Sequence, residues 1–421
     1  MRKMKDSGVA WIGEIPDDWR LIRFKDKYRS VKEIAKGQSV NYERLALTLG
    51  GVVKRPKDDS EGLQPKEFDG YQILRENDFI FKMIDLQNVS TSRVGLSPYT
   101  GLVSPAYIRF SPKKDGRESK FIYYYLMSLY YNQVFNNLGG NGVRSALSAK
   151  DMGEFMIPYP PEETEQKSIC VALDKKSEQI DALIANVQEQ IEKLKAYKQS
   201  LITEVVTKGL DPNVPMMDSG VEWIGEIPSS WNTIRVKQLL RERKERSVDG
   251  KEEPLSMSQK VGLVPTKTLD SIPNMASSFV GAKLAYVDDL VFNKLKAHLG
   301  VFSVSKYDGL VSPDYAVYYS TGVADLKYLE YLFKTPQCIS EFRKRSTGIA
   351  AGLTRLYTDG LFAIECPFPS KDKQHEIVAH LNKKCAQIDE LTAIKQTKIE
   401  KLEQYKRSLI YEYVTGKKEV S

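Results

Sequence analysis

The sequence lacks the residue clusters that mark a metalloenzyme or a disulfide-stabilised secreted protein. It has four cysteines and three histidines in 421 residues. The cysteines are scattered without CxxC spacing, which fits a reducing cytoplasm better than disulfides or zinc. His375 and His380 are five residues apart on a predicted helix, so they do not share the face that two metal ligands need. No metal site is expected.

Motifs of catalysis and of membrane insertion are also missing. No apolar stretch approaches the roughly 18 residues of a membrane span, and no apolar run follows the charged start of the chain as in a signal peptide. The only Pro-Pro pair, Pro160-Pro161, stands in Tyr-Pro-Pro-Glu and not in the Asn/Asp-Pro-Pro-Tyr/Phe motif of amino-methyltransferases. There is no Walker phosphate loop. We therefore expect a cytoplasmic protein that contacts no membrane, binds no cofactor and catalyses no reaction by itself.

The charge balance narrows the choice of partners only slightly. The net charge is +7, the pI is near 8.8 and the mean hydropathy is −0.40. These values are compatible with a polyanionic partner such as nucleic acid but do not require one.

What the sequence does contain is a long internal repeat. Three segments recur: residues 6–19 as 218–231, residues 101–105 as 309–313, and residues 166–210 as 374–418. The first keeps 11 identities in 14 positions and the third keeps 23 in 45, whereas the interiors between the repeated segments differ widely. A duplicated frame around unlike interiors indicates one architecture that presents two different surfaces. An old duplication followed by neutral drift is the alternative.

The last repeated segment predicts a long helix in each copy. Residues 162–207 contain neither proline nor glycine, and apolar residues from Ile180 to Val205 recur at three- and four-residue intervals apart from one seven-residue step past Lys198. This spacing is a heptad seam. Gly209 then ends the helix. A helix of about 45 residues spans roughly 65 Å, and its apolar stripe needs a partner. The second copy, running antiparallel, is the expected partner; packing of each helix onto its own domain is the alternative.

Five short motifs occur in both copies. They are Trp-Ile-Gly-Glu-Ile-Pro from 11 and 223, Gly-Leu-Val-Ser-Pro from 101 and 309, a Pro-x-Pro strand exit at 158–160 and 367–369, Ile-Asp-x-Leu from 180 and 388, and Tyr-Lys-x-Ser-Leu-Ile from 197 and 405. Each motif alone is weak, but together they are spread over nearly the whole chain. In this combination the chain resembles the specificity (S) subunits of type I restriction-modification systems.

The resemblance implies an α+β fold. Two globular mixed α/β target-recognition domains would be joined by two long antiparallel helices that form a coiled coil, with internal pseudo-twofold symmetry. The expected limits are 1–160 for the first domain, 161–208 for the first spacer helix, 209–370 for the second domain, and 371–417 for the second spacer helix and C-terminal tail.

The resemblance also implies a function. Each domain would read one half of a bipartite target in double-stranded DNA, and the helices would set the spacing and dock two methylation subunits. S-adenosylmethionine, used to methylate adenine, is expected on those subunits and not on this chain. Restriction (translocase) subunits are further partners in the family, and the sequence leaves their presence open. The helix residues expected in the coiled coil and in partner docking are Ile180, Leu183, Ile191, Leu194, Leu201, Ile388, Leu391, Ile399, Leu402 and Leu409.

A reader of duplex DNA needs lysine and arginine for phosphates, and arginine, lysine, asparagine or glutamine for base edges. The candidate DNA-contacting residues are Lys54, Arg55, Lys57, Lys82, Arg93 and Arg144 in the first domain, and Lys294, Lys296, Arg345 and Arg355 in the second. Lys82 and Lys294 hold equivalent places 212 residues apart. For each candidate an ordinary exposed charge is the alternative. Ser104-Pro105 and Ser312-Pro313 are expected to shape turns.

Two other functions remain open at this point. A free-standing DNA-binding regulator predicts tight, specific binding without any methylation subunit. An assembly scaffold without base reading predicts equal affinity for all DNA sequences.

Overall fold

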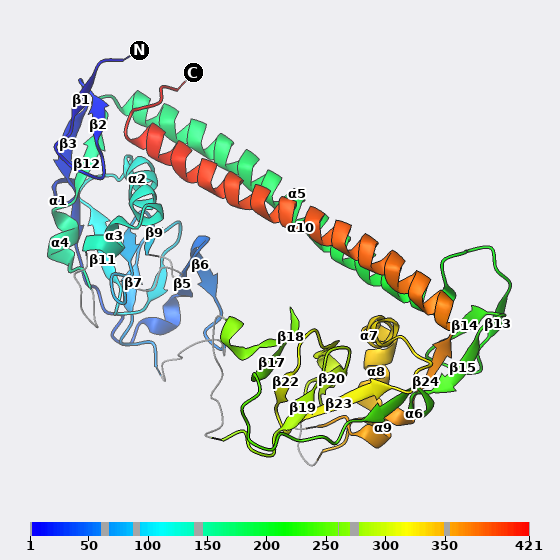
Figure 1. Ribbon diagram of the computed structural model, residues 1–421. Coiled ribbons are helices and arrows are strands. Elements are labelled where there is room, and N and C mark those ends of the chain that lie inside the picture. Colours follow the sequence, from blue (N-terminus) through cyan, green and yellow to red (C-terminus); the bar gives the residue numbers. More distant parts are fainter. Residues whose placement is uncertain are drawn as a thin grey trace. The chain divides into compact units, whose positions relative to one another are not determined.

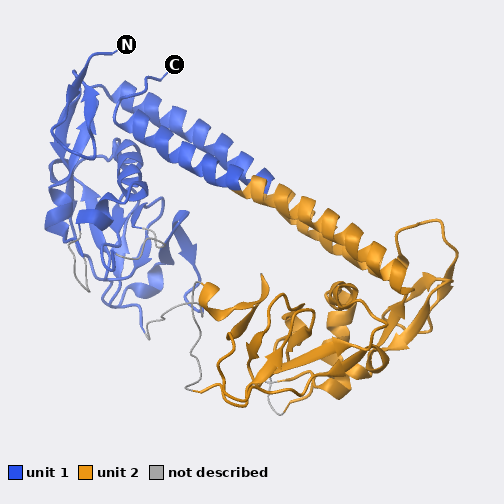
Figure 2. Cartoon of the chain, viewed as in Figure 1, with its two compact units in different colours: residues 1–187, 397–421 blue, residues 188–396 orange. Residues whose placement is uncertain are grey.

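The computed structural model describes residues 2–59, 67–86, 93–138, 146–259, 261–269, 278–348 and 354–420. The chain divides into two compact units (Figure 2). Unit 1 comprises residues 1–187 and 397–421, and unit 2 comprises residues 188–396. These limits fall inside the two long helices, because each helix contributes one half to each unit.

Unit 1 contains two larger and two smaller sheets among the described residues. The first four-stranded sheet has the order β4-β11-β8-β9: Tyr28–Ser30, Ile108–Pro112, Phe79–Phe81 and Val94–Leu96. The second has the order β6-β5-β10-β7: Gly51–Arg55, Arg44–Thr48, Gly101–Val103 and Gln72–Leu74. The two-stranded sheets are β1-β2, Met4–Asp6 with Glu14–Pro16, and β3-β12, Arg20–Arg23 with Met156–Tyr159. Within these sheets the pairs are antiparallel, except the single parallel bridge between β5 and β10.

The helices of unit 1 cover the first four-stranded sheet (Figure 1). They are α1 Phe24–Lys27, α2 Ser119–Tyr131, α3 Val134–Leu138, α4 Ala149–Gly153 and the start of α5, Glu163–Lys208; a short 3-10 helix, η1, spans Ser39–Asn41. Strand β8 is buried on both faces: Phe79 and Phe81 belong to the main core, whereas Ile80 belongs to a second cluster with Leu45 and Val103. A strand that is covered on both faces has no polar alternation, which explains the Phe-Ile-Phe run.

Unit 2 repeats this arrangement of strands. Its four-stranded sheet has the order β16-β23-β20-β21: Leu240–Glu242, Tyr315–Ser320, Leu290–Asn293 and Phe302–Val304. Four two-stranded pairs accompany it: β13 Met216–Asp218 with β14 Glu226–Pro228, β15 Asn232–Arg235 with β24 Glu365–Phe368, β17 Leu255–Ser258 with β18 Gly262–Pro265, and β19 Lys283–Ala285 with β22 Gly309–Val311. As with β8, the central strand β20 divides its side chains between two apolar clusters.

The helices of unit 2 also follow the order of unit 1. They are α6 Val236–Leu239, α7 Leu326–Phe333, α8 Pro336–Arg345, α9 Thr358–Phe362 and α10 Lys371–Val414, with 3-10 helices η2 Thr266–Thr268 and η3 Ala297–Leu299. Thr335 caps the N-terminus of α8, where Pro336 holds the first position, as helix starts favour. Both units are therefore mixed α/β, and α5 is the long helix that the sequence predicted.

In each unit a half of α5 packs against a half of α10. In unit 1, Asp181 of α5 binds Lys406 of α10. In unit 2, Lys198 binds Asp389, and Gln190 accepts a hydrogen bond from Lys395 at 2.5 Å. Residue numbers rise along one helix as they fall along the other, so the packed segments are antiparallel. The ends of both helices also enter the core of unit 1, where Ile169 of α5 and Ile410 of α10 are buried. This arrangement differs from the alternative in which each helix packs only on its own domain.

The repeated motifs have structural roles. Gln166, which follows the first Pro-x-Pro exit, is buried and donates a hydrogen bond to the Pro160 carbonyl; Gln374 does the same for Pro369. In the repeated Ser-Pro elements, the amide of Tyr107 donates to the Ser104 carbonyl, and Tyr315 donates to Ser312, so both form turns as expected. Among the described residues, no helix combines the length and apolar character that crossing a bilayer requires.

Candidate nucleic-acid interface

Three of the predicted DNA-contacting residues meet in one groove of unit 1. Lys54, Arg55 and Lys57 lie on and just after β6, and they line a groove of about 560 Å³ together with the segment Val40–Arg44. Antiparallel pairing places Arg44 of β5 directly opposite Arg55. Like charges opposite each other on neighbouring strands are unfavourable by themselves. Arg55 offsets part of this repulsion through its ion pair with Asp59 at 3.5 Å.

Local contacts hold the cations of this groove in place. Lys54 forms an ion pair with Glu43 at 2.5 Å and lies over the ring of Tyr99. The hydrogen bond to Glu43 raises the pKa of Lys54, so its ammonium group stays charged. Lys57 donates to the Ser39 carbonyl at 2.7 Å. The chain therefore presents these ammonium groups on an ordered surface.

The next two candidates, Lys82 and Arg93, have different environments. Lys82 follows β8 and is half-buried. The Arg93 side chain is fully buried, and its guanidinium donates to the carbonyls of Lys82, Ile84 and Asp85 at 2.6–3.2 Å. Burial lowers the pKa of Arg93. This geometry gives Arg93 a structural role, holding the loop after β8 in shape, and leaves it no surface for a phosphate. The sequence gives no sign that Arg93 differs from the neighbouring candidates, because its burial depends on how the loop after β8 packs in the tertiary structure.

In unit 2 the structure brings together Lys294 and Arg355. Lys294 follows β20, and its carbonyl accepts a hydrogen bond from the amide of Leu356, the residue after Arg355. Arg355 also pairs with Asp314 at 3.5 Å, and the amide of Lys294 donates to the Asp314 carbonyl. Lys82 and Lys294 each follow the equivalent strand of the equivalent sheet, as the repeat predicted.

Two further cations near Lys294 were missed from the sequence. The Lys283 ammonium donates to the Tyr315 carbonyl at 2.6 Å, and Arg246 donates to the Gly281 carbonyl. Burial lowers the pKa of Lys283, and the charges of Lys294 and Arg246 lower it further. Unit 2 therefore has its own site of positive potential. No local pattern marks Lys283, since it joins this group only when β19 pairs with β22.

The remaining DNA candidates are placed apart from these groups. Lys296 is exposed and precedes η3, whereas Arg345 ends α8 and binds Glu341. Arg144 lies outside the described residues. Within the described ranges, no group of histidine, cysteine, aspartate and glutamate side chains could hold a metal ion.

The predicted helix residues divide by burial. Five are buried between the helices: Ile180, Ile191, Ile388, Ile399 and Leu409. Three are half-buried: Leu194, Leu201 and Leu402. Leu183 and Leu391 are exposed, so they lie outside the seam between α5 and α10. The repeated Ile-Asp-x-Leu motif predicted that both its isoleucine and its leucine lie in the seam. In the structure only the isoleucine does.

The two units thus share a duplicated α/β architecture on paired helices, and each presents clustered cations. That combination defines a two-unit binding protein whose surfaces suit an anionic ligand such as DNA.

Comparison with known proteins identifies the family more closely. Residues 17–193 match the family model of the type I restriction modification DNA specificity domain. The putative type I restriction enzyme MjaX specificity subunit of Methanocaldococcus jannaschii is 23% identical over 96% of this chain and 95% of its own length. The MjaVIII specificity subunit of the same organism is 22% identical over 96% of this chain and 93% of its own length.

Solved structures share the fold. A chain from a study of complex assembly and conformational transition of the type I R-M system covers 95% of this chain and 98% of its own length, with a TM-score of 0.67 and 15% identity. The HsdS subunit of Thermoanaerobacter tengcongensis covers 98% of this chain and 99% of its own, with a TM-score of 0.51 and 16% identity.

These findings confirm the resemblance to the specificity subunits of type I restriction-modification systems that the sequence predicted. Specificity subunits are non-catalytic components of such systems.

Proposed function

We propose that each unit reads one half of a bipartite target in double-stranded DNA. In this proposal α5 and α10 form one continuous antiparallel coiled coil that sets the spacing between the two half-sites. The helices also dock two methylation subunits, which carry S-adenosylmethionine and methylate an adenine extruded from each half-site. Restriction subunits would join the complex through that core.

The main support for this proposal is that structurally equivalent positions in the two units hold side chains of different chemistry. Arg44 makes the parallel bridge to Leu102 in unit 1, and Pro254 makes the equivalent bridge to Leu310 in unit 2. The residue paired across the hairpin is Arg55 in unit 1, whereas Thr266 takes that place in unit 2, where its amide donates to the Pro254 carbonyl. One backbone thus offers two arginines in one unit and none at the same place in the other.

The neighbouring surface differs in the same way. The carbonyl of Tyr71 accepts a hydrogen bond from Ala35, and the carbonyl of Ala282 accepts the equivalent bond from Ser247. In unit 1 the Tyr71 ring packs with Phe68. Unit 2, with alanine at this position, has a cavity of about 470 Å³ lined by Ala282. Base reading requires donors, acceptors and apolar contacts that vary with the sequence read, and the two units differ at these surfaces while sharing their frame.

Exchange of one unit's interior tests independent reading. Residues 20–156 would be replaced by the equivalent segment of another specificity subunit, and the complex would be expressed with its methylation subunits. Methylome sequencing should then show a change in one half of the target and none in the other half or in the spacing. A change in both halves would contradict independent reading. Unchanged methylation would assign base reading to another chain and favour the scaffold function.

The free-standing regulator is tested with the same protein. The proposal expects weak binding by the isolated chain and strong, sequence-specific binding after the methylation subunits are added, because the partners complete the clamp on DNA. Tight specific binding by the chain alone, unaffected by those subunits, would favour a regulator.

A further inference from the structure

Unit 2 has a cavity where unit 1 has a tyrosine ring. The cavity, of about 470 Å³, lies among β17, β22 and the turn before β19. In unit 1 the amide of Tyr71 donates to the Phe68 carbonyl, and in unit 2 the amide of Ala282 donates to the Phe279 carbonyl, so the two turns are equivalent. The Tyr71 ring packs against Phe68. Alanine at the same place leaves that space open in unit 2.

The lining of the cavity combines apolar walls with a buried hydroxyl group. Its apolar walls include Leu255, Leu310 and Val311. The hydroxyls of Ser256 and Thr266 lie 2.8 Å apart, and Thr266 is 4% exposed. In such a pair one hydroxyl donates and the other accepts, which leaves one hydroxyl hydrogen with no acceptor among the described residues. Apolar walls with a few converging polar groups are typical of ligand sites of this size.

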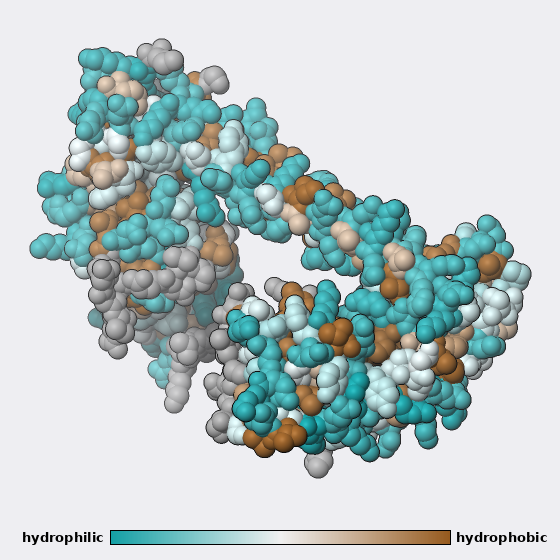
Figure 3. All heavy atoms as spheres, in the orientation of Figure 1, coloured by the Kyte–Doolittle hydropathy of each residue, from teal (hydrophilic) through white to brown (hydrophobic). Residues whose placement is uncertain are grey.

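The cavity is open to solvent. Ser278 and Val280 of its lining are exposed, and Val280 retains 65% of its accessible surface. Figure 3 shows hydrophobic side chains, in brown, at the surface of unit 2. A ligand can therefore enter the cavity without a rearrangement of the chain.

Three cations border the cavity, and each donates to the backbone of a residue in its lining. The three bonds are Lys283 to the Tyr315 carbonyl at 2.6 Å, Arg246 to the Gly281 carbonyl at 2.8 Å, and Lys294 to the Pro313 carbonyl at 3.5 Å. Positive charge is thus gathered at the edge of an apolar space.

Positive charge also exceeds negative charge at this border. Burial lowers the pKa of Lys283, and the other two cations lower it further, whereas Glu242 and Asp314 act in the opposite sense. Asp314 is itself paired with Arg355 at 3.5 Å. Four cations therefore accompany two carboxylates, and a bound phosphate would relieve the excess.

The charge of Lys283 is not needed for the fold. Strand pairing places Lys283 at the position that Gln72 holds in unit 1. Gln72 donates to the Tyr107 carbonyl at 2.7 Å, the same bond that Lys283 makes in unit 2. A neutral donor is enough for this bond, so the bond does not account for a lysine.

We propose that this cavity accepts one nucleotide of the half-site that unit 2 binds, with the base between the apolar walls and its phosphate against Lys283, Lys294 and Arg246. This inference rests on the proposed function, in which unit 2 contacts DNA. A base inside the duplex is stacked on both faces, so it enters the cavity only after it leaves the stack. Ala282 is then a specificity-determining residue, because tyrosine in its place closes the cavity.

A nucleotide matches the cavity in three respects. Its base has flat apolar faces for the walls, and its ring carries acceptors for the hydroxyl hydrogen that is left over. Its phosphate suits the cations at the border. A neutral apolar ligand would leave the cations unused, and inorganic phosphate would leave the walls uncovered.

The test closes the cavity of the full-length chain with the residue of unit 1. Ala282→Tyr would be assembled with the methylation subunits and titrated with a synthetic duplex that carries the target found by methylome sequencing. In further duplexes each nucleotide of the target is replaced in turn by an abasic one. Val323→Tyr, at a position of unit 2 that is 46% exposed and outside the cavity, is the matched control. Thermal unfolding of each variant verifies the fold.

Ala282→Tyr should bind the intact duplex at least about tenfold more weakly than the unsubstituted chain does. At one position, in the half-site of unit 2, the abasic duplex should bind both proteins equally, because the base that the cavity accepts is then absent. No position in the other half-site should have this effect. Val323→Tyr should match the unsubstituted chain with every duplex.

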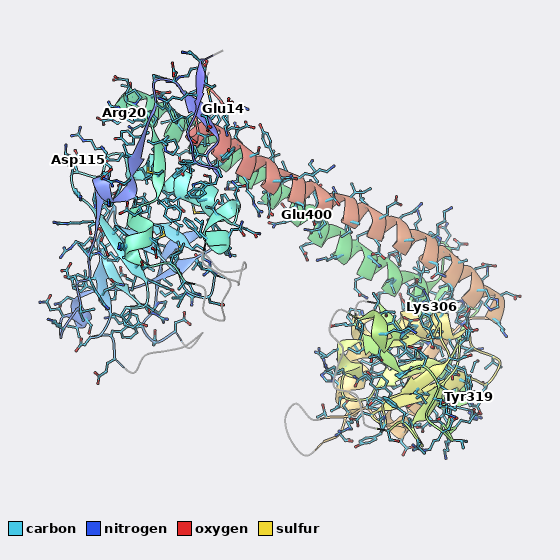
Figure 4. All side chains as sticks on the ribbon, turned by 60° about the vertical axis from the view of Figure 1, so that its left-hand side comes forward. Glu14, Arg20, Asp115, Lys306, Tyr319 and Glu400 are labelled. Carbon is cyan, nitrogen blue, oxygen red and sulfur yellow. The ribbon has the colours of Figure 1, made fainter. Side chains whose placement is uncertain are left out.

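Two milder variants leave the cavity open and test its hydroxyl and its charge. Thr266→Val should weaken binding of the intact duplex by about 3–10-fold, through the loss of one hydrogen bond. Lys283→Gln, which introduces the residue of unit 1, should reduce the slope of log K against log salt concentration by about 0.9. Lys306→Gln is the control for charge: this exposed lysine of unit 2, labelled in Figure 4, lies outside the lining, and the slope should not change.

The opposing outcomes are separable. Equal binding by Ala282→Tyr and the unsubstituted chain would overturn this inference and leave the proposed function standing. Weaker binding that no abasic position equalises would mean that the cavity accepts no base, which also overturns it. Stabilisation of the chain by free deoxynucleoside monophosphates, without an effect of Ala282→Tyr on DNA binding, would assign the cavity to a free ligand and not to DNA. If the assembled unsubstituted complex binds no duplex specifically, the proposed function itself is wrong.

Discussion

Lys406 of α10 donates to both carboxylate oxygens of Asp181 of α5, each at 2.7 Å. The duplicated pair, Lys198 of α5 with Asp389 of α10, has the same two distances of 2.7 Å. Both lysines stand at heptad position a, where an apolar residue would pack better. A polar residue at an a position costs stability and specifies which register the helices adopt, and here each lysine has its carboxylate only in the observed register.

Replacement of both seam lysines by leucine is expected to stabilise the chain and loosen the register. Lys198→Leu with Lys406→Leu should raise the free energy of unfolding by about 1 kcal/mol, because well-packed apolar side chains often stabilise a protein more than a partly buried ion pair does. Thermal unfolding would measure the gain, and disulfide cross-linking between introduced cysteines would report the register. Lys195→Leu, at an exposed position outside the seam, is the control. A less stable double variant would mean that the ion pairs outweigh apolar packing here.

Gly416, just after α10, is expected to tolerate no side chain. Its φ is +72°, and a Cβ atom would lie 2.4 Å from Cδ and Cγ of Pro16 in unit 1. Gly416→Ala should destabilise unit 1 by about 2–4 kcal/mol, from backbone strain and overpacking together. Gly8→Ala is the matched control, since Gly8 has a φ of +70° with nothing within 4 Å. It should cost about 1 kcal/mol. Equal losses in chemical denaturation would show that the contact with Pro16 relaxes without cost.

Unit 2 should lose stability in acid through Glu330. This carboxylate is buried beneath Lys327 and Lys334, whose ammonium groups lie at 2.8 and 2.5 Å. Burial alone would raise the pKa of Glu330, but the two lysines more than offset it, so the pKa lies below its usual value. A lowered folded pKa contributes stability that is complete above the unfolded value, about 4.3, and is lost as the pH falls toward the folded pKa.

Glu330→Gln tests this linkage. The variant should be less stable at pH 7, by about 1–3 kcal/mol, because two lysines lose their carboxylate. Its stability should also fall less steeply than that of the unsubstituted chain between pH 5 and the acid transition, as followed by urea unfolding at each pH. Parallel stability curves for the two proteins would assign the acid sensitivity to other carboxylates.

The groove of unit 1 should contribute to the salt dependence of DNA binding. If Lys54 and Lys57 contact phosphates, Lys54→Gln with Lys57→Gln should reduce the slope of log K against log salt concentration by about 1.8, at roughly 0.9 per contact. Fluorescence anisotropy of the assembled complex at several salt concentrations measures the slope. Lys150→Gln, on the exposed surface of α4, is the control. An unchanged slope would remove this groove from the DNA interface.

Periodicity in the sequence was enough to predict the long helices. The spacing from Ile180 to Val205 identified the apolar stripe, and the repeat supplied a partner of matching length. The same spacing did not distinguish Ile180, which is 6% exposed, from Leu183, which is 50% exposed. Heptad position separates the two only when the seam is known, because two adjacent stripes on one helix can both carry apolar residues.

The DNA-contacting candidates were harder to predict than the fold. Residue type suggested Arg93 as readily as Lys54, yet Arg93 is buried against backbone carbonyls and Lys54 is exposed. Arg44 was missed, because its position opposite Arg55 exists only once β5 pairs with β6. Charge is a property of a residue, whereas exposure of that charge is a property of the loops and strands around it.

The sequence by itself determined the duplication, the positions of the long helices and the family resemblance, since each is written in local periodicity or in residues that recur at a fixed offset. The tertiary structure alone decided which cations share a groove and which helix residues lie in the seam. Those relations depend on strand pairing and on antiparallel helix register, which join residues from tens to more than two hundred positions apart and leave no local pattern in the chain.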